Sequence, residues 1–208
     1  MPVVLVEGKG QGVATEHPEQ PTPQVEDDRL VIAAQQGQRQ PADDLVRRYL
    51  PRVYGLALRI MGNPHDAEDA AQEAMLRAMR FLSTYRPEGT FDRWVLKVAG
   101  NTCLDLLRRK RNLRVHALSH EQQAVLASAE PDPSEEVDRE RLALVQKFLP
   151  RLPEQQRTVF VLFHYERRSL RDVAEMLDVP EGTVRSSLHR ARGKLREWIL
   201  QVQEGCCQ

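Results

Sequence analysis

Residues 181–196 place seven polar side chains away from an apolar stripe, and five of the seven are Arg or Lys. They are Arg185, Ser186, His189, Arg190, Arg192, Lys194 and Arg196. An arginine can donate two parallel hydrogen bonds to the major-groove edge of a guanine, and serine, lysine or arginine can hold phosphates. These side chains could therefore read and position DNA. The alternative is a solvated cationic face on an ordinary helical hairpin.

Two short helices and a tight turn would position these side chains. Ser169 and Asp172 have the spacing of a capping box, and apolar residues then recur along one helical face. Pro180 suits the first turn of a new helix and disfavours helical backbone at the residue before it. The buried stripe of this new helix is expected to be Val184, Leu188, Ala191 and Leu195. The pattern predicts a helix-turn-helix that reads DNA in the major groove.

Charge is distributed unevenly along the chain, although its 208 residues contain 30 Lys plus Arg and 30 Asp plus Glu. Residues 41–116 carry 14 basic against 9 acidic side chains, and residues 151–208 carry 10 against 8. Acidic side chains outnumber basic ones in residues 1–40 and 117–150. This distribution predicts two DNA-facing modules with acidic connectors, not a uniformly basic coat.

The sequence offers little for catalysis, metal binding or secretion. Its six histidines fall in no metal-ligand or nucleophile arrangement, and the early segment VVLVEGKGQG lacks the spacing of a phosphate-binding loop. Cys103 is expected in a helical core, and Cys206 and Cys207 fit an incidental tail better than a metal or redox site. No apolar run has membrane-spanning length and no signal-peptide pattern is present. We therefore expect a cytoplasmic, non-enzymatic protein with no cofactor and no membrane insertion.

Acidic and amide side chains gather on one side of the helix predicted after Gly62. Asn63 and Pro64 form its cap and first turn. Its packing side is expected to carry Ala67, Ala70, Ala71, Ala74, Ala78 and Phe81. Its opposite side carries Asp66, Asp69, Gln72 and Glu73. A solvated face explains such a cluster, and so does a docking site for another protein.

Four of the eleven aromatic residues fall between positions 81 and 94, close to cationic side chains. They are Phe81, Tyr85, Phe91 and Trp94. Aromatic rings can stack on unpaired bases while Arg or Lys holds the backbone. Phe81 and Phe91 fit a helical core better, whereas Tyr85 and Trp94 fit a core and base stacking equally well. The basic segment 108–114 is expected to contact phosphates.

The whole pattern predicts an all-α protein with two small domains, an N-terminal helical bundle and a C-terminal helix-turn-helix domain, joined by a flexible acidic linker. Residues 1–26, rich in Pro, Gly, Gln and Glu, are expected to form a disordered arm. The bundle should span 27–115 and the helix-turn-helix domain 138–202. The linker then falls at 116–137 and a short tail at 203–208.

Three segments of the chain resemble the ECF-type (extracytoplasmic function) alternative sigma factors, the small promoter-specificity subunits of bacterial RNA polymerase. The segments are NPHDAEDAAQEAMLRAMRFL, FDRWVLKVAGNTCLDLLRRKR and LPEQQRTVFVLFHYERRSLRDVAEMLDVPEGTVRSSLHRARGKLRE. Their order and spacing match the two family domains and cover residues 27–114 and 138–200. The resemblance implies a protein that binds core RNA polymerase and directs promoter recognition and transcription initiation. Catalysis would belong to the polymerase.

The resemblance also implies roles for individual residues. It implies that the largest polymerase subunit is bound by Asp66, Asp69, Gln72 and Glu73. Recognition and melting of the minus-ten element fall to Tyr85, Arg86, Trp94, Lys97, Asn101, Asp105, Arg108 and Arg109, and the loop 83–91 would capture a flipped base. Recognition of the minus-thirty-five element falls to Arg185, Ser186, His189, Arg190 and Lys194. An anti-sigma factor is implied as a further partner, beside core polymerase and promoter DNA.

Some residues depart from the family pattern, and one other function stays open. Gly100 and Cys103 stand in the melting helix where the family often has larger or different residues, and Pro87 stiffens the capture loop. The alternative function is a helix-turn-helix transcription regulator that binds operator DNA without polymerase. Its N-terminal part would then be a sensor or dimerisation domain. A net charge of zero favours a sigma factor that binds DNA weakly when free.

Overall fold

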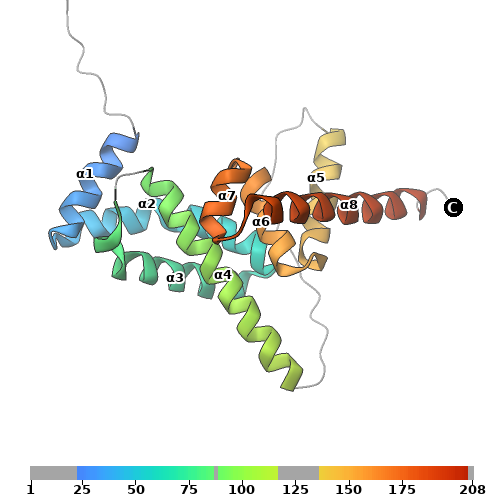
Figure 1. Ribbon diagram of the computed structural model, residues 1–208, viewed down its shortest axis with the longest axis horizontal. Coiled ribbons are helices and arrows are strands. Elements are labelled where there is room, and N and C mark those ends of the chain that lie inside the picture. The colour runs from blue at the N-terminus through green and yellow to red at the C-terminus, as the bar shows by residue number, and fades with distance from the viewer. Residues whose placement is uncertain (1–22, 87–88, 117–135, 206–208) are drawn as a thin grey trace, which may run out of the picture.

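The computed structural model describes residues 23–86, 89–116 and 136–205, which Figure 1 shows as helices joined by short turns. No strand occurs within these three ranges, so the predicted all-α fold is confirmed. The segment VVLVEGKGQG, most of the expected linker, and Cys206 and Cys207 lie outside the described residues.

The N-terminal bundle, as we name residues 23–116, begins slightly earlier than the hydrophobic pattern indicated. Its elements are α1 (Pro23–Gln35), α2 (Arg39–Met61), α3 (Pro64–Arg80), the 3-10 turn η1 (Leu82–Thr84) and α4 (Phe91–His116). Helix α1 starts four residues before Asp27, because Pro23 suits a first turn and Glu26 lies near the positive end of the helix dipole. Helix α2 continues through Pro51.

The turn between α2 and α3 forms as the sequence predicts. Gly62 adopts a left-handed conformation with φ of 83°, and its N–H donates to the carbonyl of Leu58. Asn63 caps α3 by accepting a hydrogen bond from the backbone N–H of Asp66 at 2.9 Å. Pro64 occupies the first turn, so both predicted caps are confirmed.

Small side chains allow α3 to pack closely against the rest of the N-terminal bundle. All five alanines predicted on its packing side are buried. Phe81 is 51% exposed, however, and its assignment to the core is wrong. The α-helix ends at Arg80 and the backbone tightens into η1, so the helical periodicity shifts by one residue. Leu82 takes the inward position instead.

The C-terminal helices, as we name residues 136–205, contain the predicted helix-turn-helix. Their elements are α5 (Glu136–Phe148), the 3-10 turn η2 (Leu149–Arg151), α6 (Glu154–His164), α7 (Leu170–Leu177) and α8 (Glu181–Gly205). The capping box of Ser169 and Asp172 is present, and Asp178 ends α7 in a left-handed conformation with φ of 53°. The predicted stripe of α8 is buried at all four positions, so this part of the prediction is confirmed.

The two groups of helices pack directly against each other and share one continuous apolar core. Helix α7 lies against α4, and α6 lies against α2 and α4 (Figure 1). Gly100 of α4 is buried at this contact, where a Cβ atom would lie 3.8 Å from Leu162 and 3.9 Å from Leu177. The charge and hydrophobic patterns of the sequence predict two separate modules and give no signal for this contact.

Candidate nucleic-acid interface and docking surface

The predicted minus-thirty-five contacts lie on the outer face of α8. Arg185, His189 and Arg190 are exposed, whereas Ser186 and Lys194 are half-buried. The buried stripe of α8 fixes this orientation, because residues on the other side of the helix must then face solvent. Helix α8 thus presents these five side chains together, as a recognition helix requires.

Weak local contacts hold two guanidinium groups on this face. Arg185 Nη2 lies 2.9 Å from Glu181 Oε1. Arg190 Nε and Nη2 each lie 3.3 Å from an oxygen of Ser186, the carbonyl and the hydroxyl respectively. The Arg185 side chain is 71% exposed, and such pairs contribute little to stability in water. Both groups can therefore exchange these partners for base edges or phosphates.

The first helix of the motif is fixed by its N-terminal cap. The Ser169 hydroxyl donates to Asp172 Oδ2 at 2.6 Å, and the backbone N–H of Asp172 donates to Ser169 Oγ at 3.0 Å. The hydrogen bond from Ser169 lowers the pKa of the Asp172 carboxyl, and the nearby charge of Arg93 acts in the same direction. The carboxylate is therefore ionised at neutral pH and stabilises the helix start.

Four of the predicted minus-ten residues line one pocket of about 290 Å³. They are Tyr85, Arg86, Trp94 and Lys97. The pocket lies beside the N-terminal part of α4, next to Gly89 and Thr90. Its chemistry suits an unstacked base, because aromatic walls and three cationic side chains, Arg86, Arg93 and Lys97, surround the same space.

The aromatic residues of this pocket divide into core and surface groups. Phe91 is buried, which confirms its expected place in the core. Tyr85 is only 5% exposed, its ring meets those of Phe91 and Trp94 edge-on, and its hydroxyl donates to the Gly89 carbonyl at 2.7 Å. Tyr85 therefore belongs to the packed wall of the pocket. Trp94 is only partly buried and remains accessible at the pocket surface.

The other predicted minus-ten residues lie farther along α4. Asn101 donates through its side-chain amide to the backbone carbonyl of Met176 at 3.0 Å. Asp105 accepts a hydrogen bond from Arg77 of α3 at 3.2 Å. Arg108 and Arg109 are exposed on the last turns of α4, which project from the packed helices in Figure 1. Arg109 has no ion-pair partner among the described residues, and Arg108 has only a loose ion pair with Asp105 at 3.9 Å, so phosphates can reach both.

The predicted docking residues of α3 differ in their exposure to solvent and in their partners within the protein. Asp69 and Gln72 are exposed, and the Asp69 side chain is 65% accessible. Glu73 accepts a hydrogen bond from Arg77 Nε at 2.7 Å. Asp66 is ion-paired with Lys110 of α4 and accepts a hydrogen bond from the Asn63 side chain at 2.7 Å. Partial burial opposes its ionisation, but the hydrogen bonds from Asn63 and Lys110 outweigh it and lower the pKa of Asp66.

Charged residues also pair across the contact between α4 and the C-terminal helices, and the sequence did not predict these pairs. Arg93 Nη2 lies 3.1 Å from Asp172 Oδ1, and Arg93 also pairs with Glu175. Asp92 pairs with both Arg52 and Arg168. No sequence signal marks these pairs, because helical spacing predicts only partners three or four residues apart. Arg93 and Glu175 are separated by 82 residues.

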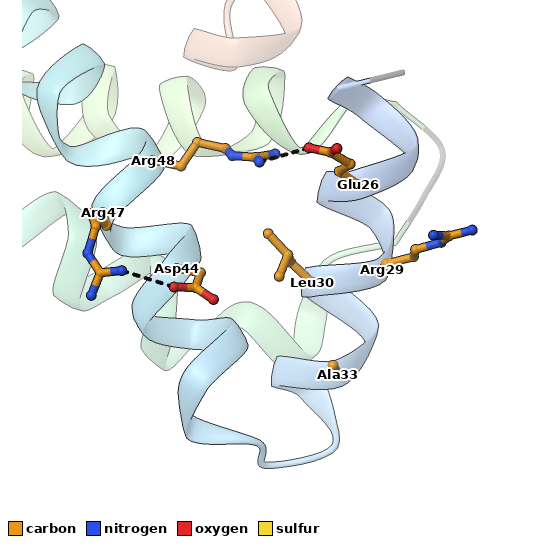
Figure 2. A pocket seen from close by; sticks show the side chains of 7 residues that line it. All are labelled: Glu26, Arg29, Leu30, Ala33, Asp44, Arg47 and Arg48. Atoms are coloured by element: carbon orange, nitrogen blue, oxygen red, sulfur yellow. Dashed lines mark hydrogen bonds and ion pairs between the residues drawn. The ribbon is translucent and has the colours of Figure 1, made fainter. Parts of the chain in front are cut away.

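A larger hollow of about 730 Å³ lies between α1 and α2 and was also missed. Figure 2 shows Leu30 of α1 pointing toward α2, and the Arg29 side chain pointing away from α2. Arg48 lies 2.9 Å from Glu26, and Arg47 lies 3.1 Å from Asp44. These guanidinium groups are already neutralised by neighbouring carboxylates. The hollow therefore lacks converging polar groups that would select a ligand.

Two further observations concern sites outside these surfaces. Among the residues that the structure describes, no group of three or more His, Cys, Asp or Glu side chains could hold a metal ion. No helix in the same residues is long and apolar enough to cross a membrane. Cys103 is buried as expected, and burial raises the pKa of its thiol to about 12.

Comparison with known proteins assigns both halves of the chain. Sigma-70 region 2 matches residues 45–113, and Sigma-70 region 4 matches residues 142–195. ECF RNA polymerase sigma factor SigE of Mycolicibacterium smegmatis is 40% identical over 160 residues, which cover 76% of this chain and 62% of that protein. ECF RNA polymerase sigma factor SigW of Bacillus subtilis is 31% identical over 182 residues, which cover 84% of this chain and 97% of SigW.

Two solved structures share the fold. Sigma factor RpoE from Bartonella quintana, in complex with the anti-sigma factor NepR, has a TM-score of 0.62 at 19% identity and covers 76% of this chain and 95% of its own. CnrH, in complex with the cytosolic domain of CnrY, has a TM-score of 0.57 at 24% identity, with coverage of 84% and 97%. The chain therefore belongs to the ECF family of RNA polymerase sigma factors, which are specificity subunits that direct transcription initiation and leave catalysis to the polymerase.

Proposed function

We propose that this chain binds core RNA polymerase and places one DNA-reading surface on each of two promoter elements. Residues 27–115 would form the minus-ten domain and residues 138–202 the minus-thirty-five domain, with residues 116–137 as the linker between them. The observation that carries this proposal is that one chain has two separate surfaces suited to binding DNA. An exposed basic recognition helix and an aromatic pocket flanked by cations have different chemistries, which suit duplex and unstacked DNA respectively.

Upstream recognition is assigned to the exposed face of α8. Arg185 and Arg190 supply forked donors for guanine or phosphate, while Ser186, His189 and Lys194 supply shorter or single donors. The exposure of both arginines supports this assignment, since neither has to leave a buried partner before it binds DNA.

Minus-ten recognition is assigned to the pocket and to the face of α4 that continues from it. Trp94 offers a stacking surface, and Arg86 and Lys97 can hold the phosphates beside a captured base. Tyr85 supports this pocket from the protein side. Asn101 and Asp105 would contact bases or backbone farther along the element, and Arg108 and Arg109 would contact phosphates.

Docking on core polymerase is assigned to the exposed acidic face of α3. Asp69 and Gln72 are the accessible groups, and Glu73 is adjacent to them although Arg77 occupies part of its carboxylate. Asp66 would contribute by fixing α3 against α4, because its carboxylate is already used by Asn63 and Lys110. An electropositive surface on the polymerase is the matching partner.

The setting of this function is the cytoplasm, where core polymerase and promoter DNA are found. We also propose an anti-sigma factor as a regulatory partner. One structure with the same fold holds the sigma factor RpoE in complex with the anti-sigma factor NepR, and another holds CnrH in complex with the cytosolic domain of CnrY. The identity of such a partner for this chain is to be sought among proteins with a small cytosolic domain.

Run-off transcription with purified core polymerase tests the proposal. The chain should direct initiation from a subset of genomic fragments, and Asp69→Ala with Glu73→Ala should weaken core binding without unfolding the protein. Glu68→Ala is the matched control, because Glu68 is an exposed acid on the same helix outside the predicted docking set. Tight operator binding without polymerase and no activity with core enzyme would support the transcription-regulator alternative instead.

A further inference from the structure

The backbone turn that leads into the predicted minus-ten pocket is held by a residue of α1. Gln35 is the last residue of α1. Its side-chain amide nitrogen donates to the carbonyl of Leu82 at 2.8 Å and to the carbonyl of Tyr85 at 3.2 Å. An amide nitrogen carries two hydrogens, so both bonds form at once. We name this pair of hydrogen bonds the Gln35 clamp.

The Gln35 clamp joins the two ends of the 3-10 turn η1. Leu82 begins η1, Tyr85 follows its last residue, and the N–H of Tyr85 donates to the Leu82 carbonyl at 3.1 Å. A 3-10 turn has poorer hydrogen-bond geometry than an α-helix and is short. A donor from another helix that reaches both carbonyls therefore fixes the backbone from which Tyr85 and Arg86 enter the pocket.

Tyr85 connects the Gln35 clamp to the interior of the pocket. Its side chain is buried, and its hydroxyl donates to the Gly89 carbonyl at 2.7 Å. Its ring meets that of Trp94 edge-on, with 5.6 Å between the centroids. A shift of the Tyr85 backbone would therefore move the ring that supports Trp94, as well as the adjacent Arg86. Gln35 is not among the residues that line the pocket, so the clamp acts on it through Tyr85.

The way in which α1 ends fixes the position of Gln35. Gly37 adopts a left-handed conformation with φ of 86°, and its N–H donates to the Ala34 carbonyl at 3.0 Å. The N–H of Gln38 donates to the Ala33 carbonyl at 3.2 Å. A left-handed residue with such hydrogen bonds ends a helix at a defined position, and glycine adopts it without strain. Gln35 is thus presented by a helix with a defined end.

The other end of α1 is anchored behind the same pocket. Asp27 is only 7% exposed and accepts hydrogen bonds from Tyr49 and Arg48 of α2, and Arg48 also pairs with Glu26 (Figure 2). Burial and the hydrogen bond to Asp27 raise the pKa of Tyr49, so its hydroxyl remains a donor at neutral pH. The Tyr49 ring lies edge-on to Phe91, with 5.1 Å between the centroids. Helix α1 is therefore braced against the aromatic cluster of the pocket at both of its ends.

We propose that Gln35 is a positioning residue for minus-ten recognition, which sets the place of Tyr85 and Arg86 through the Gln35 clamp and thereby the base that the pocket accepts. This inference rests on the function proposed above. Helix α1 lies before residues 45–113, which match Sigma-70 region 2, so that match assigns it no role. The residues that determine minus-ten recognition then include one on a helix that does not line the pocket.

Hydrogen–deuterium exchange of the free full-length chain tests the Gln35 clamp itself. Gln35→Met keeps an unbranched side chain with a similar helix propensity but has no donor. The backbone amides of residues 82–86 should then exchange about three- to tenfold faster, since two hydrogen bonds near the surface are lost. Gln36→Met changes the exposed neighbouring residue and should leave their exchange as in the wild type. Equal exchange in the two variants would overturn the proposal, because the clamp would then not hold the turn.

Promoter discrimination tests the consequence for DNA. Each variant would be assembled with core polymerase on a promoter fragment found by run-off transcription, with every minus-ten position replaced in turn by the other bases. The wild type should prefer the captured base about tenfold or more in open-complex formation, and Gln35→Met should reduce this preference about threefold or more at one position. Its dependence on the minus-thirty-five element should not change. An equal loss on all fragments would indicate a merely destabilised protein and would contradict a positioning role.

Gln35→Glu separates hydrogen bonding from packing. A glutamate has nearly the same shape, but its carboxylate only accepts hydrogen bonds and would face two carbonyl oxygens. It should therefore lose at least as much discrimination as Gln35→Met. Wild-type discrimination in Gln35→Glu would show that shape alone matters and would overturn the clamp. A wild-type chain that initiates at no promoter would refute the proposed sigma function instead, and the exchange experiment would still decide whether Gln35 holds the turn.

Discussion

At the scale of single residues, the arginines of the recognition helix make only weak contacts within the protein. Arg190 makes two 3.3 Å contacts with Ser186, which lie beyond the usual range of strong N–H···O bonds. A bidentate contact with guanine would replace them with shorter bonds of better geometry. The exposed position of Arg190 therefore favours a direct reading role over a structural one.

Arg190→Ala should reduce initiation from promoters that depend on the upstream element. The loss expected for one base-reading arginine is about 1–3 kcal/mol, which would be measured as open-complex formation on matched and altered upstream sequences. Arg196→Ala is the control for loss of positive charge on α8, because Arg196 is exposed but is not one of the five residues assigned to the minus-thirty-five element. A loss that is equal for every upstream sequence would make Arg190 a phosphate contact.

Asp172 gives a pH-dependent contribution to stability. Its pKa is lowered in the folded protein by the hydrogen bond from Ser169 and by Arg93, so folding favours the ionised carboxyl. This contribution is fully present above the unfolded pKa of about 3.9 and disappears as the pH falls through the lower folded value. Asp172→Asn should cost about 0.3–1 kcal/mol near pH 7, because it removes a negative charge from the first turn of the helix. Urea unfolding of both proteins from pH 7 to pH 3 should show this difference shrinking below pH 4, and a constant difference would exclude the mechanism.

At the scale of helices, the small face of α3 determines how closely the N-terminal bundle packs. Ala67, Ala70 and Ala78 are fully buried, so the backbone of α3 approaches its neighbours without intervening side chains. The same packing directs Asp69 and Gln72 outward. The docking surface therefore depends on residues that never contact a partner.

Ala70→Leu should destabilise the N-terminal bundle because three added carbons have no space in the buried face. Overpacking of this kind costs about 1–3 kcal/mol, and it would be measured as a lower urea midpoint. Glu68→Leu adds a leucine on the exposed side of the same helix and should leave the midpoint nearly unchanged. Equal effects of the two substitutions would show that α3 is not closely packed.

Local sequence signals predicted these helices better than they predicted contacts between them. The capping box at Ser169, the glycine stop at Gly62 and the stripe of α8 all depend on residues within a few positions of one another. Phe81 failed because the change from α-helix to 3-10 turn moved the inward position to Leu82. The Arg93–Glu175 pair could not be predicted, because its partners meet only after both halves have folded.

At the scale of the whole molecule, a zero net charge conceals ion pairs that join the two halves of the chain. Arg93 of α4 pairs with the acidic Glu175 of the C-terminal helices. In the second pair the charges are exchanged, because Arg168 comes from the C-terminal half and Asp92 from α4. Their side chains are partly accessible to solvent. Salt should therefore weaken the contact, because screening acts strongly on accessible charges.

Raising NaCl from about 0.1 M to about 1 M shortens the Debye length from about 10 Å to about 3 Å and should expand the free chain. Small-angle scattering at both concentrations would measure this expansion. The Arg93→Gln, Glu175→Gln double variant is the control, because it lacks this ion pair and its radius should change less with salt. A wild-type radius that does not change with salt would show that the apolar layer around Gly100 maintains the contact without help from the ion pairs.

The position of Trp94 gives the molecule a built-in fluorescent reporter. The chain contains two tryptophans, and the other, Trp198, lies on α8 with its ring centroid 5.9 Å from that of Phe148. In a Trp198→Phe background, all tryptophan emission would come from an indole that lies in the same pocket as Met176. Hydration of this ring should shift its emission to longer wavelengths, and stacking on a base should quench it. One unlabelled side chain could thus distinguish packed, hydrated and DNA-bound states of this ring in a single titration.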